Sequence, residues 1–348
     1  MLELVELTDV NLTKWEKKRR KTLFVYTLQN ILNGIEFSLV DITSWFYVTT
    51  LMNDVKSPKL FYGLVTAMVY IGPMILVTPV SKWLSKTRRV RKLLITFNMF
   101  NLIGSMLYII PFSPYYAMVA RFLYGFNLIL RSVITSELFH SYTDNELQQK
   151  VTLMSLGVFL GEAAGAIISF LLLKTDFWIG SIHVTYGNVC SLPISVMTLI
   201  QLLLIVAMSH DVSSEYDLNP STTGVNNNML YRHSVNDCTV SDRKNVPKFD
   251  FVFLLCLAFY CGVWIQLPIR LLPIIVEQIE YPRGVVTILF LGYSILNIMI
   301  LLMVVRVKFT NDAIFYSGVS SLFFLIVLSL CIYCTNRGAN KSKKSLSL

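Results

Sequence analysis

The sequence predicts an all-α, polytopic membrane protein, and two observations lead to that prediction. The chain of 348 residues is 54% hydrophobic and only 15% charged, whereas a soluble protein carries about 25% charged residues. Its apolar residues also fall into nine blocks, each near the roughly 20 residues that a helix needs to cross the hydrocarbon core of a bilayer. We therefore expect nine membrane-crossing helices, six before a polar segment at 209–248 and three after it.

The first six blocks fill residues 23–208 and follow a polar N-terminal segment at 1–22. They are expected at about 23–50, 60–84, 93–110, 115–138, 151–173 and 189–208. Short polar or proline-containing links separate them, such as the turn from Pro111 to Pro114. Within the second block, Pro73 and Pro79 predict a kinked or broken helix, because proline removes a helical hydrogen bond.

The rest of the chain begins with the segment 209–248, which is rich in Asn, Ser, Thr and Asp and shows little periodicity. That composition favours a disordered linker. Three further blocks at about 249–276, 285–305 and 313–334 make up a region at 249–334, and 335–348 form a polar, basic tail. Nine crossings would put this basic tail outside, which suggests that the chain stops short of a longer arrangement.

The distribution of Lys and Arg predicts the orientation. With the N-terminus inside, the inner segments hold nineteen of these residues and the short outer links hold four. Since cytoplasmic loops carry the excess of positive charge, the N-terminus and the linker are expected in the cytosol. The same bias accounts for the net charge of +9 without a nucleic-acid partner. The expected partners are the lipid bilayer and a small-molecule or ion solute, and oligomerisation stays open.

Several charged and polar side chains lie inside the apolar blocks, where an ionisable residue is costly and is a functional hypothesis by default. Four lie deep within their blocks and are interpreted as a substrate or coupling-ion path: Glu36, Arg121, Arg131 and Glu162. Opposite charges on different helices are expected to pair, so that Glu36 or Glu162 would neutralise Arg121 or Arg131. Four more are secondary candidates, for which helix packing or contact with the membrane interface is the alternative interpretation: Asn33, Asp41, Gln266 and Arg270.

The fifth block carries glycines at every fourth position, Gly157, Gly161 and Gly165. Small residues at this spacing let helix backbones approach closely, which predicts tight packing. Cys331 and Cys334 form a C-x-x-C pair with no second pair and no nearby His, so we expect no metal and no cofactor. No phosphate loop and no nucleophile–base spacing occurs in the sequence, which argues against an enzyme.

The order of six blocks, a long cytoplasmic linker and further blocks resembles the major facilitator superfamily. The basic stretch Lys86–Lys92 lies where that family has its Gly/Asp/Arg-rich loop between helices two and three. Arg121-Phe-Leu-Tyr-Gly125 fits the Arg-x-x-x-Gly signature of helix four, and Gly157–Gly165 fits the glycine-rich motif of helix five. Within the superfamily, Ala120–Gly165 is similar to the lysosomal branch typified by ceroid-lipofuscinosis neuronal protein 7.

This resemblance implies a complete six-helix N-terminal lobe and a partial, three-helix C-terminal lobe. It implies a secondary active transporter that moves a small solute across an endomembrane, such as that of the lysosome, by alternating access, with proton coupling as one driving force. In that mechanism Arg121 or Arg131 would hold substrate charge, Glu36 or Glu162 would exchange a proton, and Gly125 would serve helix packing. The loop after the second helix lacks the usual glycine and aspartate, and Glu162 replaces a usual proline.

Two other functions stay open at this point. Arginine-lined constrictions favour anions, so an anion-permeable channel of a lysosomal membrane is one alternative. The incomplete second lobe makes a truncated membrane interaction protein without transport activity the other.

Overall fold

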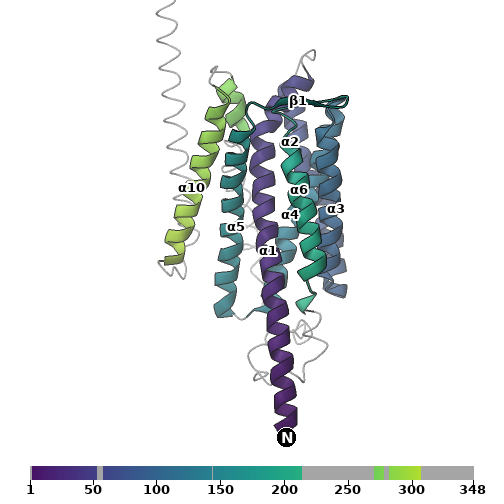
Figure 1. Cartoon of the computed structure of the whole chain (residues 1–348), viewed down its shortest axis with the longest axis vertical. Helices are drawn as coiled ribbons and strands as arrows, with labels where there is room; N and C mark the ends of the chain where they lie inside the picture. Colours follow the sequence, from purple (N-terminus) through teal and green to yellow (C-terminus); the bar gives the residue numbers. More distant parts are fainter. Residues whose placement is uncertain (1, 53–57, 143, 214–269, 278–281, 307–348) are drawn as a thin grey trace, which may run out of the picture. The chain divides into compact units, whose positions relative to one another are not determined.

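The computed structural model describes residues 2–52, 58–142, 144–213, 270–277 and 282–306 (Figure 1). The chain divides into two compact units, Met1–Asp237 and Cys238–Leu348. The described part of the first unit contains six long helices in chain order: α1 (Leu2–Leu51), α2 (Pro58–Thr87), α3 (Val90–Ile109), α4 (Pro114–Ser141), α5 (Asp144–Leu171) and α6 (Ser191–Met208). The helices α2 to α6 are each long and apolar enough to cross a membrane. The predicted all-α membrane fold is therefore confirmed.

The second unit is described over two stretches. Residues 270–277 are helical, and α10 (Gly284–Arg306) coincides with the block expected at 285–305. Most of the block expected at 249–276, all of the block at 313–334 and the tail at 335–348 lie outside the described residues, as do residues 214–248 of the predicted linker.

Helix α1 is longer than the first apolar block and runs through the boundary expected between residues 22 and 23. Its first half is rich in Leu, Glu, Lys and Arg, which have high helix propensity, and neither Gly nor Pro occurs before Gly34. The helix therefore continues past the ends of α5 and α6 (Figure 1). The polar link expected around 140–150 is largely helical too, because α4 extends to Ser141 and α5 begins at Asp144.

Helix α2 continues through both of its prolines, so the break considered for this block is absent. Pro73 cannot donate to the carbonyl of Val69, four residues earlier. That carbonyl lies against Gly125 of α4, where an added Cβ would collide with it. Thus the carbonyl that Pro73 deprives of its usual helical donor lies where α2 and α4 approach closely.

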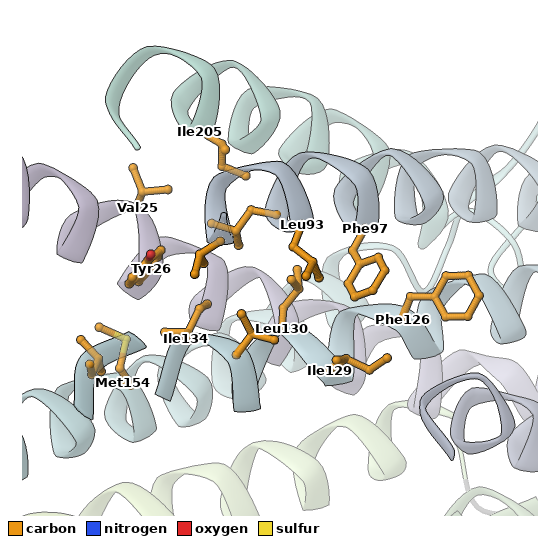
Figure 2. Close-up of a cluster of buried hydrophobic side chains, with 14 of the residues drawn as sticks. Val25, Tyr26, Leu93, Phe97, Phe126, Ile129, Leu130, Ile134, Met154 and Ile205 are labelled. Carbon is orange, nitrogen blue, oxygen red and sulfur yellow. The ribbon is translucent and has the colours of Figure 1, made fainter. Parts of the chain in front are cut away.

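The helices of the first unit pack in a definite set of neighbours: α1 against α5 and α6, α3 against α4 and α6, and α2 against α4. A hydrophobic core joins five of them (Figure 2). Its buried side chains come from α1, α3, α4, α5 and α6, and include Tyr26, Phe97, Leu130, Met154 and Ile205. This core lies toward the end of the bundle from which the N-terminal part of α1 extends.

The connection from α5 to α6 holds an antiparallel hairpin that the sequence analysis did not predict. Strand β1 (Asp176–Ile179) pairs with β2 (Ile182–Thr185). Gly180 and Ser181 form the two-residue turn, and Gly180 has a φ of +61°, as the tight turns of hairpins require at their first central position. The hairpin lies at the end of the bundle opposite the N-terminus (Figure 1).

Candidate functional site

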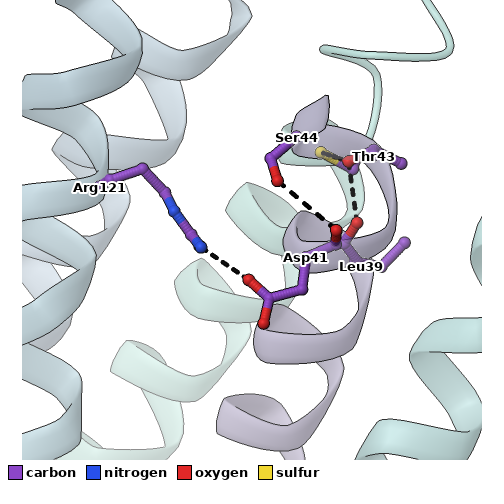
Figure 3. A network of polar contacts seen from close by, with 6 residues as sticks. Leu39, Asp41, Thr43, Ser44 and Arg121 are labelled. Carbon is purple, nitrogen blue, oxygen red and sulfur yellow. Dashed lines mark hydrogen bonds and ion pairs between the residues drawn. The ribbon is translucent and has the colours of Figure 1, made fainter. Parts of the chain in front are cut away.

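The centre of the first unit contains a buried ion pair between two helices. Arg121 of α4 donates from Nη2 to Oδ1 of Asp41 on α1 at 2.7 Å, and the two residues are 2% and 1% exposed. Figure 3 shows the guanidinium reaching across to the carboxylate. The sequence-based pairing of Arg121 with Glu36 or Glu162 is therefore wrong, and Asp41, a secondary candidate, is the partner.

The antiparallel course of α1 and α4 explains this choice of partner. Moving along α1 from Asp41 back to Glu36 brings the contact on α4 from Arg121 forward to Asn127. Arg121 therefore lies at the same height along the helix axis as Asp41. Glu36 lies about one and a half turns of α1 closer to the N-terminus, in a helix that rises 1.5 Å per residue. Sequence spacing within one helix does not reveal this register between helices.

Glu36 is held by two amides. Its Oε2 accepts hydrogen bonds from Nδ2 of Asn101 at 2.8 Å and from Nδ2 of Asn127 at 3.3 Å. The residue is 7% exposed, and Arg121 is near enough for the two charges to interact. Arg121 therefore pairs directly with Asp41 and lies within electrostatic range of Glu36.

The polar stripe on α1 continues from Glu36 toward the N-terminus and faces α3. Nδ2 of Asn98 donates to Oε1 of Gln29 at 2.9 Å, and Nε2 of Gln29 donates to Oδ1 of Asn33 at 3.0 Å. Gln29 and Asn98 are fully buried. The secondary candidate Asn33 thus belongs to a side-chain network at the interface of α1 and α3.

Several buried polar atoms around this cluster make no hydrogen bond within the described residues. They are the hydroxyl groups of Tyr108 and Tyr124 and the Oδ1 atoms of Asn101 and Asn127. Both tyrosines are nearly fully buried. Buried polar groups are almost always hydrogen-bonded, so these four atoms keep capacity to bind a polar group inside the lobe.

Arg131 and Glu162 are less buried than Glu36 and Arg121. Arg131 is exposed on α4 and lines a shallow hollow of about 510 Å³ with Ser132, Thr135 and Ser136. Glu162 of α5 is half-buried and is near enough to Arg131 for their charges to interact. Glu162 is also near enough to Asp41 for their charges to interact. Of the four residues interpreted as one path, Glu36 and Arg121 are therefore buried, whereas Glu162 is half-buried and Arg131 is exposed.

The two remaining secondary candidates belong to the second unit. Gln266 lies outside the described residues, and Arg270 begins the helical stretch 270–277.

The glycines of α5 pack this helix against α1. A Cβ at Gly161 would collide with the carbonyl of Ile31 and lie 3.0 Å from Cα of Gly34. A Cβ at Gly165 would meet Oγ of Ser38, whereas one at Gly157 would lie 3.4 Å from its nearest neighbour, an ordinary contact. The close approach is thus centred on Gly161, and its partner Gly34 was not singled out from the sequence.

The asparagines that hold the network were also missed. Asn98, Asn101 and Asn127 lie within apolar blocks, where an uncharged amide is also rare and also needs a partner. The sequence analysis considered the uncharged amides Asn33 and Gln266 but none in the third and fourth blocks. Applying the same argument to Asn98 and Asn101, three residues apart on one face of the third helix, would have found them.

Comparisons with known proteins agree with this architecture. The family model described as Major Facilitator Superfamily matches residues 27–339. Among solved structures, the crystal structure of a D-xylose-proton symporter superimposes with a TM-score of 0.59 at 11% sequence identity, over 82% of this chain and 68% of that one. At that identity the likeness shows the fold alone. No curated protein matches the chain.

Proposed function

We propose that this chain, which belongs to the major facilitator superfamily, moves a small polar solute across a membrane by alternating access and couples that movement to a proton. The observation that supports the coupling is the buried group formed by Arg121, Asp41 and Glu36. One cation pairs with one carboxyl group and lies within electrostatic range of a second, inside a single helical lobe.

The charges of this group favour a proton as the coupled ion. With both carboxyl groups ionised, one guanidinium leaves one negative charge in a region from which water is largely excluded. Burying an uncompensated carboxylate is costly, so a single proton brings the group to neutrality. Proton uptake by Asp41 would free Arg121 to move toward Glu36. Proton uptake by Glu36 would instead leave Arg121 paired with Asp41. The proton therefore selects between two arrangements of Arg121, which is the differential interaction that a ligand needs to shift a conformational equilibrium.

The solute side of the proposal depends on the remaining polar atoms. The hydroxyl groups of Tyr108 and Tyr124 and the amide oxygens of Asn101 and Asn127 can bind a hydroxylated or otherwise polar solute next to the charged group. The D-xylose-proton symporter, which shares this fold, is named for a polar solute and a proton. Arg131 is proposed to attract solute charge at the surface hollow, with Glu162 as a second proton-exchanging group.

We also propose an endomembrane location, in the lysosome, with the N-terminus in the cytosol. The similarity of Ala120–Gly165 to the lysosomal branch supports the location, and the excess of Lys and Arg in alternate links supports the orientation. Colocalisation of the tagged full chain with a lysosomal membrane marker tests the first point.

Transport can be tested with the purified full chain in vesicles that enclose the pH-sensitive dye pyranine. D-xylose and a panel of pentoses, hexoses, amino acids and monocarboxylates are added in turn. We expect at least one solute to cause a saturable change of internal pH that Asp41→Asn abolishes. Asp176→Asn is the matched control, because Asp176 is an exposed carboxylate outside the lobe interior. Saturable solute uptake without proton movement would overturn the coupling, and a flux that rises linearly with solute would favour the channel alternative.

A further inference from the structure

The hairpin of β1 and β2 has one apolar and one polar face. Because Phe177 pairs with Val184 and Ile179 pairs with Ile182, these four side chains share one face, as cross-strand partners do. The opposite face carries the pairs Asp176 with Thr185 and Trp178 with His183.

The polar face is held together by its own contacts. Nε2 of His183 lies 2.7 Å from Oδ1 of Asp176, and the rings of Trp178 and His183 stack with centroids 4.5 Å apart. This face therefore has an internal structure that does not depend on the helices.

The helical bundle covers only half of the apolar face. Val184 of β2 is fully buried, which shows that this face is turned toward the bundle. Its neighbours on β1 are not covered, since Phe177 is 41% exposed and Ile179 is 48% exposed. Strand β1 thus leaves two large apolar side chains only partly covered by the part of the chain that the structure describes.

The position of the hairpin relative to the helix ends is fixed. Nδ2 of Asn188 donates to the carbonyl of Ile109 at the end of α3 and to that of His183 in β2. Just after β2, the hydroxyl of Tyr186 lies 2.9 Å from Oγ of Ser169 on α5. The hairpin therefore lies level with the last residues of α3 and α5, two helices that are long and apolar enough to cross a membrane.

The helix that leads into the hairpin also ends in uncovered apolar side chains. Phe170 and Leu171, at the end of α5, are 52% and 76% exposed and lie on a helix that is long and apolar enough to cross a membrane. Trp and Tyr are enriched at the headgroup level of a bilayer because their rings are amphipathic, and the hairpin carries Trp178 between Phe177 and Ile179.

We propose that the β1–β2 hairpin is an interfacial membrane anchor: it lies flat on the lipid headgroups, with Phe177 and Ile179 in the acyl boundary and Trp178 and His183 facing water. The occupant of the uncovered face is thus the lipid surface itself. The inference concerns the placement of the protein in the membrane and is independent of the transported solute.

Nitroxide labels can test this placement in the full chain, with its six cysteines replaced by alanine and reconstituted in phosphatidylcholine vesicles. Single cysteines are labelled at Phe177, Trp178 and Ile179, with Leu171 as the lipid reference and Ser181 as the water reference. Collision rates are measured with oxygen, which partitions into lipid, and with a neutral nickel chelate, which stays in water.

The expected result alternates along the strand. The ratio of oxygen to nickel collisions should be several-fold higher at 177 and 179 than at 178, and should approach that of 171. High nickel access at all three positions would place the strand in water and overturn the proposal. Low access to both reagents at 177 and 179 would also overturn it, since the face would then be covered by protein, either another segment or a second copy.

A second variant protects the test against misfolding of the labelled proteins. Phe177→Trp keeps an aromatic ring at the position, and its added fluorescence should be quenched by brominated phosphatidylcholine. Trp178→Phe is the comparison at the neighbouring position. Because Trp178 faces water, removing its ring should change the lipid-dependent quenching of the parent protein only slightly. Absence of added quenching at 177 contradicts the anchor.

Discussion

The ion pair of Asp41 and Arg121 predicts a strong non-additivity between two substitutions. The charged atoms are 2.7 Å apart, a separation at which unit charges attract by about 6 kcal/mol at an effective dielectric constant of about 20. Most of that attraction offsets the loss of hydration. Removing only one partner leaves an uncompensated charge in a nearly fully buried position, which costs about 3–5 kcal/mol. Asp41→Asn and Arg121→Gln should therefore each destabilise the protein, and the double variant should be more stable than either.

The assay is the thermal midpoint of the purified full chain in mild detergent, followed by tryptophan fluorescence. For a unit of 150–250 residues, 1 kcal/mol corresponds to about 2–4 °C, so each single variant should lose about 6–20 °C. The double variant should recover at least half of that loss, because it places two neutral amides in contact. Glu146→Gln is the control: Glu146 is exposed and lies 3.7 Å from half-buried Arg19, and ion pairs with an exposed partner contribute about 1 kcal/mol or less.

Simple additivity would refute this reasoning. If the double variant loses as much as the two single variants together, Asp41 and Arg121 do not neutralise each other in the folded protein. If all three variants match the parent within about 1 °C, a shift that corresponds to less than about 0.5 kcal/mol, the two charges are solvated. Either outcome would also remove the observation on which the proton-coupling proposal depends.

Four further predictions concern other parts of the chain. Glu36→Gln should abolish pH-dependent flux in pyranine-loaded vesicles without changing fold or location. Unchanged flux would mean that Glu36 contributes only a polar contact to helix packing. Gly161→Ala should destabilise by about 1–3 kcal/mol through overpacking, whereas Gly157→Ala should be near neutral; equal thermal midpoints would contradict the close approach of α1 and α5. Arg131→Gln should weaken solute uptake while the thermal midpoint stays unchanged, because the residue is exposed. An impermeant thiol reagent applied to the cytosolic side should label Cys238, and labelling from the other side would reverse the predicted topology.

The helices themselves were predictable because bilayer thickness imposes a length on every apolar block. The blocks expected at 93–110 and 189–208 differ from α3 and α6 by three residues or fewer at each end. The start of the first helix was predicted wrongly because it was placed where the charged residues end. Charge ends a membrane-crossing segment but does not end a helix, and the Lys- and Arg-rich stretch before residue 22 remains helical. Hydropathy locates the membrane, whereas Gly, Pro and capping residues locate helix ends.

The candidate site was only partly predictable. Composition identified Glu36 and Arg121 as costly residues at membrane depth, but the partner of Arg121 depends on the register between two helices, which no pattern within one helix contains. The hairpin left a clearer signal. Residues 176–185 contain Gly180-Ser181 between two short runs rich in β-branched and aromatic residues, which is a hairpin pattern; it was read as part of a polar link between two helices.

The ion pair of Asp41 and Arg121 connects two pairs of tightly packed helices. Helices α1 and α5 approach backbone to backbone at Gly161, and α2 and α4 do so at Gly125, so each pair of helices is expected to move as one body. Between α1 and α4 the contacts are few, and the ion pair is a prominent one among them. A proton that breaks this contact therefore acts between two helices that make few direct contacts with each other. Packed cores are bistable rather than continuously deformable, so a change of one charge at this junction can favour a second arrangement of α1 with α5 against α2 with α4, without disturbing the glycine contacts that hold each pair together.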